Sequence, residues 1–150
     1  VLLHFAGRSL EAETNAAYDT LELGGARDRV RVYGFATDFH RYSGAADVII
    51  ARGGMGSLTE FALQQKACLI VPSKQLGWNV KNSRVLAERG AIVELNEDQA
   101  EQPERLGRTI ADLLEHPDTR AELGRKLAGL ARPAAAHDLA AIILRCGAEG

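Results

Sequence analysis

Short apolar segments alternate along this chain with longer segments in which apolar residues recur every three or four positions. The short segments lie at residues 1–6, 29–34, 46–51, 67–71 and 91–95. The longer segments lie at residues 9–23, near 37–44, at 57–65 and at 78–89. This alternation is typical of strand–helix units that build a parallel sheet with helices on both faces. We therefore predict an α/β fold with a Rossmann-like parallel sheet.

Two of the predicted strands, residues 48–51 and 68–71, are continuously apolar rather than alternating apolar with polar residues. Continuous apolar character is expected where helices cover both faces of a strand. We expect both strands to be central in the sheet.

The C-terminal third contains helical patterns and no further strand after Asn96. Pro103 suits the first turn of a helix that ends near residues 116–117. Asp118 is expected to cap a second helix, and Pro133 to open a third. No repeat, linker or change of composition marks a second domain. We expect residues 1–150 to form one domain, with a helical C-terminal tail that covers the sheet.

The composition excludes several classes of protein. The chain has 150 residues and a formal charge of -2, with 18 basic and 20 acidic residues interspersed, so no field favours nucleic acid as a partner. No apolar run approaches the roughly 20 residues that span a bilayer. Cys68 and Cys146 lack the spacing of metal or redox sites and are interpreted as packing residues. We expect a cytoplasmic protein without a bound metal.

A glycine-rich segment carries the clearest chemical signal. Residues 46–51 form a predicted buried strand, followed by Gly53, Gly54 and Gly56 and then by a predicted helix. Such a turn directs main-chain N–H groups and a helix dipole out of the carboxyl edge of the sheet, which suits an anion such as phosphate. The segment lacks the lysine of a P-loop and the glycine spacing of a dinucleotide site.

This segment leaves two alternatives open. The glycines can serve only to make a tight turn between strand and helix. Ser57 and Glu60 match a capping box, in which Glu60 bonds back to the helix terminus. The functional alternative is that Glu60 accepts hydrogen bonds from vicinal hydroxyl groups, such as those of a ribose.

A second polar loop follows the predicted strand at residues 67–71. It contains Trp78, the only tryptophan of the chain, with Asn79 and Asn82 on or near the first turn of the next helix. Amides suit sugar hydroxyls, and an exposed indole suits the apolar face of a sugar ring. The alternatives are helix capping for the two asparagines and packing for Trp78.

Together these segments resemble the C-terminal, donor-binding half of family 28 glycosyltransferases of the GT-B type. The resemblance spans nearly the whole chain and includes residues 4–7, 33–35, 46–50, 52–60, 71–72, 79, 81–82 and 87–91. In that family, main chain after the third strand holds uracil, the glycine-rich turn faces the diphosphate, a glutamate binds the ribose, and the second loop contacts the sugar. The substrate-binding residues that this resemblance implies are Phe35, Ala36, Arg52, Gly53, Gly54, Met55, Gly56, Ser57, Glu60, Trp78, Asn79 and Asn82.

The chain also departs from the family pattern. Many relatives carry His-Gln or Gln-Gln where this chain has Trp78 and Asn79. One strand–helix unit that normally opens the domain is not recognised before Val1, and neither is the acceptor-binding half, which usually supplies the catalytic base. The resemblance therefore implies a domain that binds a donor but does not catalyse transfer alone, and no catalytic residue is assigned.

The activity implied for the complete enzyme is an inverting transfer of a hexosaminyl group from a UDP-GlcNAc-like donor to an acceptor hydroxyl. The expected partners are the UDP-sugar and an acceptor-binding domain or subunit, with no further cofactor. A lipid-linked acceptor would bring the complex to a membrane surface through the missing half. A nucleotide-sugar epimerase and a non-catalytic binding module on the same fold remain alternatives.

Overall fold

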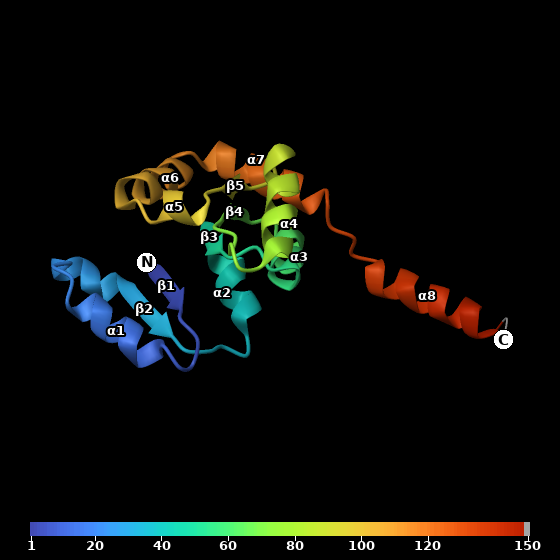
Figure 1. Ribbon diagram of the computed structural model, residues 1–150, viewed down its shortest axis with the longest axis horizontal. Coiled ribbons are helices and arrows are strands. Elements are labelled where there is room, and N and C mark those ends of the chain that lie inside the picture. Colours follow the sequence, from blue (N-terminus) through green and yellow to red (C-terminus); the bar gives the residue numbers. More distant parts are fainter. Residues whose placement is uncertain (149–150) are drawn as a thin grey trace. The chain divides into compact units, whose positions relative to one another are not determined.

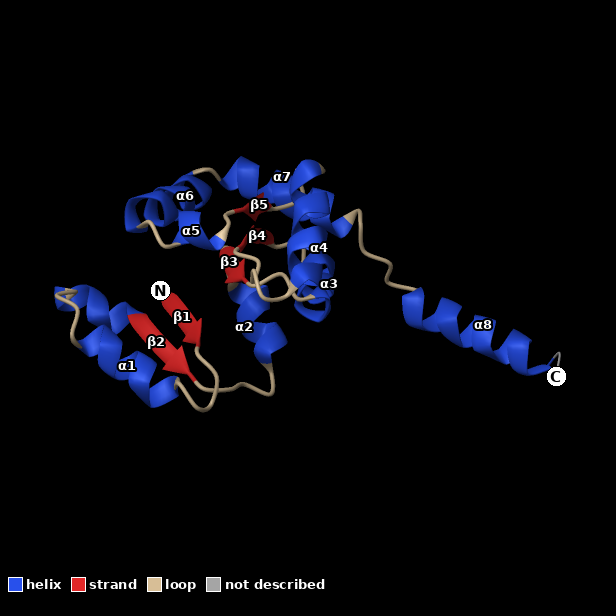
Figure 2. Ribbon diagram, viewed as in Figure 1, coloured by secondary structure: helices blue, strands red, loops and turns tan. Residues whose placement is uncertain are grey.

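A computed structural model of the chain describes residues 1–148, in which strands and helices alternate as predicted (Figures 1 and 2). The strands are β1 (Leu2–Phe5), β2 (Val30–Tyr33), β3 (Val48–Ala51), β4 (Ala67–Ile70) and β5 (Val93–Glu94). The helices are α1 (Glu11–Asp19), α2 (Phe39–Ala45), α3 (Met55–Leu63), α4 (Gly77–Glu88), α5 (Glu97–Ala100), α6 (Pro103–Glu115), α7 (Pro117–Ala128) and α8 (Ala135–Ala148). A 3-10 segment, Gly24–Arg29, precedes β2. The chain divides into an N-terminal unit, residues 1–39, and a C-terminal unit, which begins at residue 40.

The N-terminal unit is a parallel pair of strands with α1 against β2. Leu2 lies opposite Val30 and Phe5 opposite Tyr33. Phe5 also stacks on Tyr33, with 5.2 Å between ring centroids. Aromatic contacts of this kind contribute beyond the apolar area that they bury, so they strengthen a unit that has only two strands.

The C-terminal unit contains a parallel sheet with the order β3–β4–β5. All four residues of β4 are buried, and because neighbouring side chains point to opposite faces, both faces of this strand are covered. Ala67, Leu69 and Val71 pack in one core cluster with Leu113 of α6 and Leu123 of α7. The prediction of a central strand at residues 68–71 is confirmed.

The corresponding prediction for β3 is wrong for the residues described. Within residues 1–148, β3 pairs with β4 alone and is an edge strand, and Ile50 is 46 % exposed. The described strands form two parallel sheets, β1–β2 and β3–β4–β5, so the predicted α/β class with parallel strands is confirmed. A central strand pairs with a neighbouring strand along each of its two edges. The described residues supply a neighbour to one edge of β3 only.

The helical tail follows the prediction in outline. Pro103 is the first residue of α6, as expected, but α7 begins at Pro117 after His116, so Asp118 is not the capping residue. A proline with φ fixed near -65° is already suited to the first helical position, which explains this earlier start. The last helix begins at Ala135, two residues after Pro133.

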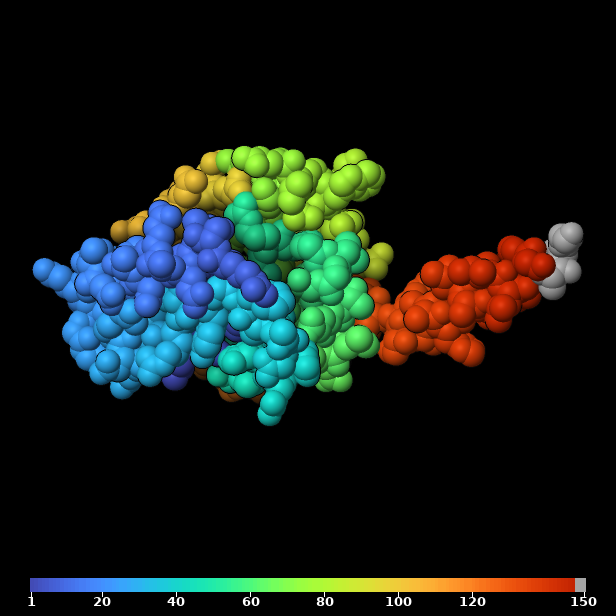
Figure 3. Space-filling model, turned by 90° about the horizontal axis from the view of Figure 1, so that it is seen from below, coloured from blue at the N-terminus to red at the C-terminus, as the bar shows by residue number. Residues whose placement is uncertain are grey.

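Helix α8 does not cover a sheet as predicted. Its apolar residues Leu139, Ile142 and Ile143 are exposed. In Figure 3 this helix is drawn in red, and no other part of the chain covers the face that is in view. Cys146 of the same helix is exposed too, whereas Cys68 in β4 is buried as predicted. Within residues 1–148, no helix has both the length and the apolar character needed to cross a bilayer.

Candidate functional site

Strand β3 runs directly into the glycine-rich turn, and Gly53 makes the turn possible. Its φ is +79°, a conformation that residues with a side chain rarely adopt. A Cβ at this position would also lie 3.1 Å from Cγ2 of Ile70 in β4. The chain can therefore leave β3 and turn into α3 at this point only with a glycine, and the predicted strand, turn and helix are confirmed.

The beginning of α3 is open for a ligand. Gly54 precedes the helix in an extended conformation, and a Cβ on Gly54 or Gly56 would meet nothing within 4 Å. Met55, Gly56 and Ser57 are exposed. The first N–H groups of an α-helix have no partner within the helix, and the dipole gives this end positive character. The geometry suits an anion.

Glu60 does not belong to a capping box. Helix α3 begins at Met55, and its N-cap residue is Gly54, so Ser57 is the third residue of the helix rather than its cap. Oε1 of Glu60 is buried and has no hydrogen-bond partner among the described residues. A buried carboxylate oxygen without a donor is costly, and this side chain is therefore a candidate to accept a hydrogen bond from a ligand.

Helix α4 begins after β4, at the same edge of the sheet. Trp78 is 76 % exposed, so packing does not explain it, and Nζ of Lys81 lies 5.5 Å from the centre of its ring system. Leu76 is the capping position, and no side chain within residues 1–148 caps α4, so neither Asn79 nor Asn82 is a helix cap. Nδ2 of Asn79 instead donates to the carbonyl oxygen of Arg52, at 3.1 Å.

The sequence reasoning missed two acidic residues at this edge, Glu97 and Asp98 of α5. Glu97 pairs with the guanidinium of Arg52, and Asp98 pairs with the ammonium of Lys74. A capping box in which Asn96 and Gln99 exchange hydrogen bonds of 2.9 and 3.0 Å begins this short helix. The pattern Asn-x-x-Gln directly after the last strand was the signal that could have located α5.

These ion pairs shift two pKa values. The guanidinium of Arg52 lowers the pKa of Glu97 through their hydrogen bond. The carboxylate of Asp98 raises the pKa of Lys74 in the same way. Arg52 and Lys74 therefore bring cationic groups to the edge, and both groups have an anionic partner from α5.

The N-terminal unit holds the other two predicted residues, Phe35 and Ala36. They follow β2 and line a hollow of about 300 Å³ together with Phe5, Gly7, Gly34 and Phe39. The Phe35 ring is exposed, and the guanidinium carbon of Arg8 lies 4.4 Å from its centre. The hollow is mainly apolar, and its size suits a small planar group.

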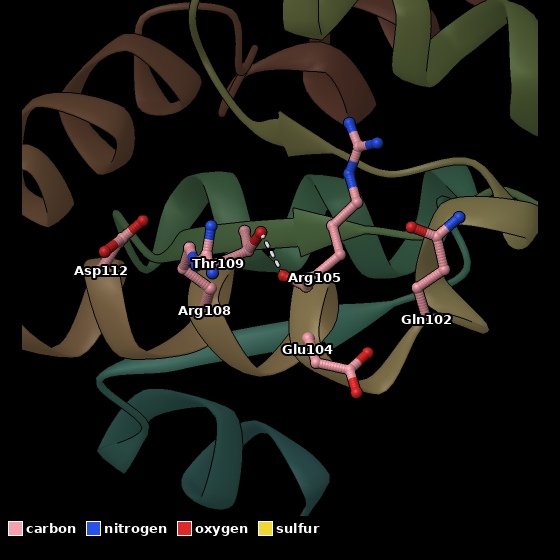
Figure 4. A pocket seen from close by; sticks show the side chains of 6 residues that line it. All are labelled: Gln102, Glu104, Arg105, Arg108, Thr109 and Asp112. Atoms are coloured by element: carbon pink, nitrogen blue, oxygen red, sulfur yellow. Dashed lines mark hydrogen bonds between the residues drawn. The ribbon is translucent and has the colours of Figure 1, made fainter.

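A further hollow, of about 530 Å³, lies on the polar face of α6 (Figure 4). It is lined by Gln102, Glu104, Arg105, Arg108, Thr109 and Asp112, and the hydroxyl of Thr109 donates to the carbonyl oxygen of Arg105 at 2.9 Å. Five of the six residues lie on α6 and Gln102 directly precedes this helix, and the charged side chains among them include both signs. This arrangement is typical of a solvated helix face, and none of the six residues was predicted to bind a substrate.

The predicted residues thus form two groups. The C-terminal unit brings Arg52 and Gly53 next to Asn79, because Asn79 bonds to Arg52 and lies within 4 Å of a Cβ built on Gly53. The N-terminal unit brings Phe35 and Ala36 together in one hollow.

Residues 1–139 match the glycosyltransferase family 28 C-terminal domain. Two similar proteins, from Rubrobacter xylanophilus and Sorangium cellulosum, are both named UDP-N-acetylglucosamine–N-acetylmuramyl-(pentapeptide) pyrophosphoryl-undecaprenol N-acetylglucosamine transferase. Each is 32 % identical to this chain. The match to the Rubrobacter protein covers 89 % of this chain and 43 % of that protein, and the match to the Sorangium protein covers 95 % of this chain and 35 % of that protein.

Solved structures agree with this match. The crystal structure of MurG from Acinetobacter baumannii superposes with a TM-score of 0.78 at 25 % identity, over 97 % of this chain and 41 % of that protein. The glycosyltransferase VinC, solved in complex with dTDP, has the same fold, with a TM-score of 0.70 over 93 % of this chain and 33 % of its own. The fold is therefore that of a GT-B glycosyltransferase half, and the chain belongs to glycosyltransferase family 28, of which it carries the C-terminal domain.

Proposed function

We propose that this domain binds the nucleotide-sugar donor of an inverting glycosyltransferase that transfers a hexosaminyl group to an acceptor hydroxyl. The observation that carries the proposal is the buried Oε1 of Glu60, which has no hydrogen-bond partner within residues 1–148. It lies one turn inside a helix whose first N–H groups are open to a ligand. Family membership favours transfer over the epimerase alternative.

In this proposal each part of a UDP-sugar has its own partner. The main chain of residues 53–57 binds the diphosphate, because free N–H groups and the helix dipole stabilise negative charge. Glu60 accepts hydrogen bonds from the ribose hydroxyls. The apolar hollow beside Phe35 and Ala36 takes the uracil ring, which the main chain of these two residues holds.

The exposed face of Trp78 and the amide of Asn82 are the proposed contacts with the donor sugar. One amide hydrogen of Asn79 is already used by the carbonyl oxygen of Arg52, so its side-chain oxygen is the group left to face the sugar. The sugar is GlcNAc-like in this proposal.

The reaction follows from these contacts. An acceptor hydroxyl displaces UDP from the anomeric carbon, and the helix terminus stabilises the charge that grows on the leaving diphosphate. The proposal requires neither a metal nor a cofactor.

The activity requires more than this chain, which spans less than half the length of the relatives described above. An acceptor-binding half, on the same chain or on a partner subunit, would supply the acceptor site and the catalytic base. We also propose a further strand–helix unit, for which the unpaired edge of β1 or of β3 offers a place. The two relatives are named for an undecaprenol-linked acceptor, so a lipid-linked acceptor, reached from the cytoplasm at a membrane surface, is proposed here as well.

Titration with UDP tests the proposal. Glu60→Ala in the full-length protein should weaken UDP binding by about 1–3 kcal/mol, the usual cost of losing a hydrogen bond to a charged group. Glu88→Gln, which changes an exposed carboxylate at the end of α4, is the control and should bind as the parent protein does. An unchanged affinity in a folded Glu60→Ala variant would overturn the ribose role, and a parent protein that binds no UDP would overturn donor binding itself.

A further inference from the structure

Glu97 links three consecutive loops at the carboxyl edge of the β3–β4–β5 sheet. It lies on α5, directly after β5. One of its carboxylate oxygens pairs with Nη2 of Arg52, which follows β3. Its other oxygen accepts a hydrogen bond of 3.4 Å from the main-chain N–H of Lys74, which follows β4. Both carboxylate oxygens are thus engaged, and the Glu97 side chain is only 23 % exposed.

Arg52 is consequently held at two points. Asn79 binds its carbonyl oxygen, and Glu97 binds one end of its guanidinium. A guanidinium carries five N–H donors, and this ion pair engages only one of its terminal nitrogens. Among the residues that the structure describes, Nε and Nη1 are left for another acceptor. The Arg52 side chain is 57 % exposed, and a free arginine at such a site would occupy many rotamers.

We propose that Glu97 is a positioning residue of the donor site, which acts by holding the guanidinium of Arg52 beside the glycine-rich turn for the diphosphate of the nucleotide-sugar. The inference rests on the proposed function, because it assumes that a diphosphate binds at residues 53–57. Ordering Arg52 before the ligand arrives removes an entropy cost from binding. The neighbouring Asp98 has no such role, because it pairs with the ammonium of Lys74 and its side chain is 72 % exposed.

The first experiment compares UDP with uridine as probes of the full-length protein, by calorimetric titration. Glu97→Gln should weaken UDP binding about 3- to 10-fold, the effect expected when one long side chain must be ordered on binding. The same variant should bind uridine as the parent protein does, because uridine lacks the diphosphate. Asp98→Asn is the matched control and should leave both affinities unchanged.

The second experiment repeats the substitution in an Arg52→Ala background. If Glu97 acts through Arg52, Glu97→Gln has no further effect on UDP binding there. The inference is overturned if Glu97→Gln weakens UDP and uridine equally, if its effect persists without Arg52, or if UDP binds equally well or more tightly. Tighter binding would mean that the carboxylate mainly repels the diphosphate. A parent protein that binds neither probe would instead overturn the proposed function.

Discussion

Nδ2 of Asn79 lies 3.1 Å from the carbonyl oxygen of Arg52, and this hydrogen bond joins the loop after β3 to the first turn of α4. The two residues are 27 positions apart in the sequence, yet both belong to loops that leave the carboxyl edge of neighbouring parallel strands. Asn79 was expected to face a sugar, and in this structure one end of its amide is bonded to the main chain beside the glycine-rich turn.

Asn79→Ala should therefore lower the stability of the protein. Loss of one hydrogen bond to a main-chain carbonyl costs about 0.5–1.5 kcal/mol. Urea denaturation of the variant and its parent would measure this difference. Asn82→Ala, one turn further along α4, is the control and should cost less than about 0.5 kcal/mol. Equal effects of the two substitutions would show that the bond to Arg52 contributes nothing specific.

Gly53→Ala should be strongly destabilising. The positive φ of this residue and the nearby Cγ2 of Ile70 both oppose a Cβ, so we expect a loss of about 1–3 kcal/mol in free energy of unfolding. Gly56→Ala is the matched control, because it lies inside α3 with open space around it. It should raise helix propensity and leave stability unchanged or higher by up to about 1 kcal/mol. Equal stability of the Gly53→Ala and Gly56→Ala variants would contradict this prediction, because it would mean that the turn can adopt another conformation at little cost.

The two thiols should differ in reactivity. Burial raises the pKa of the Cys68 thiol to about 12, so almost none of it is thiolate at pH 8. Cys146 is exposed on α8. Brief treatment of the native protein with iodoacetamide, followed by peptide mass spectrometry, should find Cys146 modified and Cys68 intact. Addition of urea should expose Cys68 to the reagent, and rapid modification of Cys68 in the native protein would contradict the burial of β4.

The Arg52–Glu97 pair should make stability depend on pH. Arg52 lowers the pKa of Glu97 in the folded protein, so the folded state binds a proton less readily than the unfolded chain does. The resulting stabilisation is fully present above the ordinary pKa of a glutamate and is lost as pH falls through the lowered value. The stability difference between the parent protein and Glu97→Gln should therefore shrink on acidification through this range. In an Arg52→Ala background the pH dependence of that difference should be much smaller.

Local patterns were enough to predict most elements of the fold. Continuous apolar residues predicted β4 as a buried strand, and three closely spaced glycines predicted a turn between β3 and α3. These features depend on neighbours in the sequence, because side-chain periodicity and backbone freedom act over a few residues. Helix α5 was missed because its four residues are too few to show a helical period.

Other features depended on which segments meet in space. The sequence alone left Glu60 with two roles, and only the start of α3 at Met55 removed the capping box. The edge position of β3 is decided by strand pairing, which an apolar run does not specify. The pairing of Arg52 with Glu97, 45 positions away, needs parallel strands that carry their loops to a common edge. The sequence by itself thus determined the strand–helix order, the glycine-rich turn and the resemblance to family 28, because these are local or ordered patterns. Only the tertiary structure decided which charged groups stand beside that turn, because side-chain contacts between distant loops depend on how the strands pair.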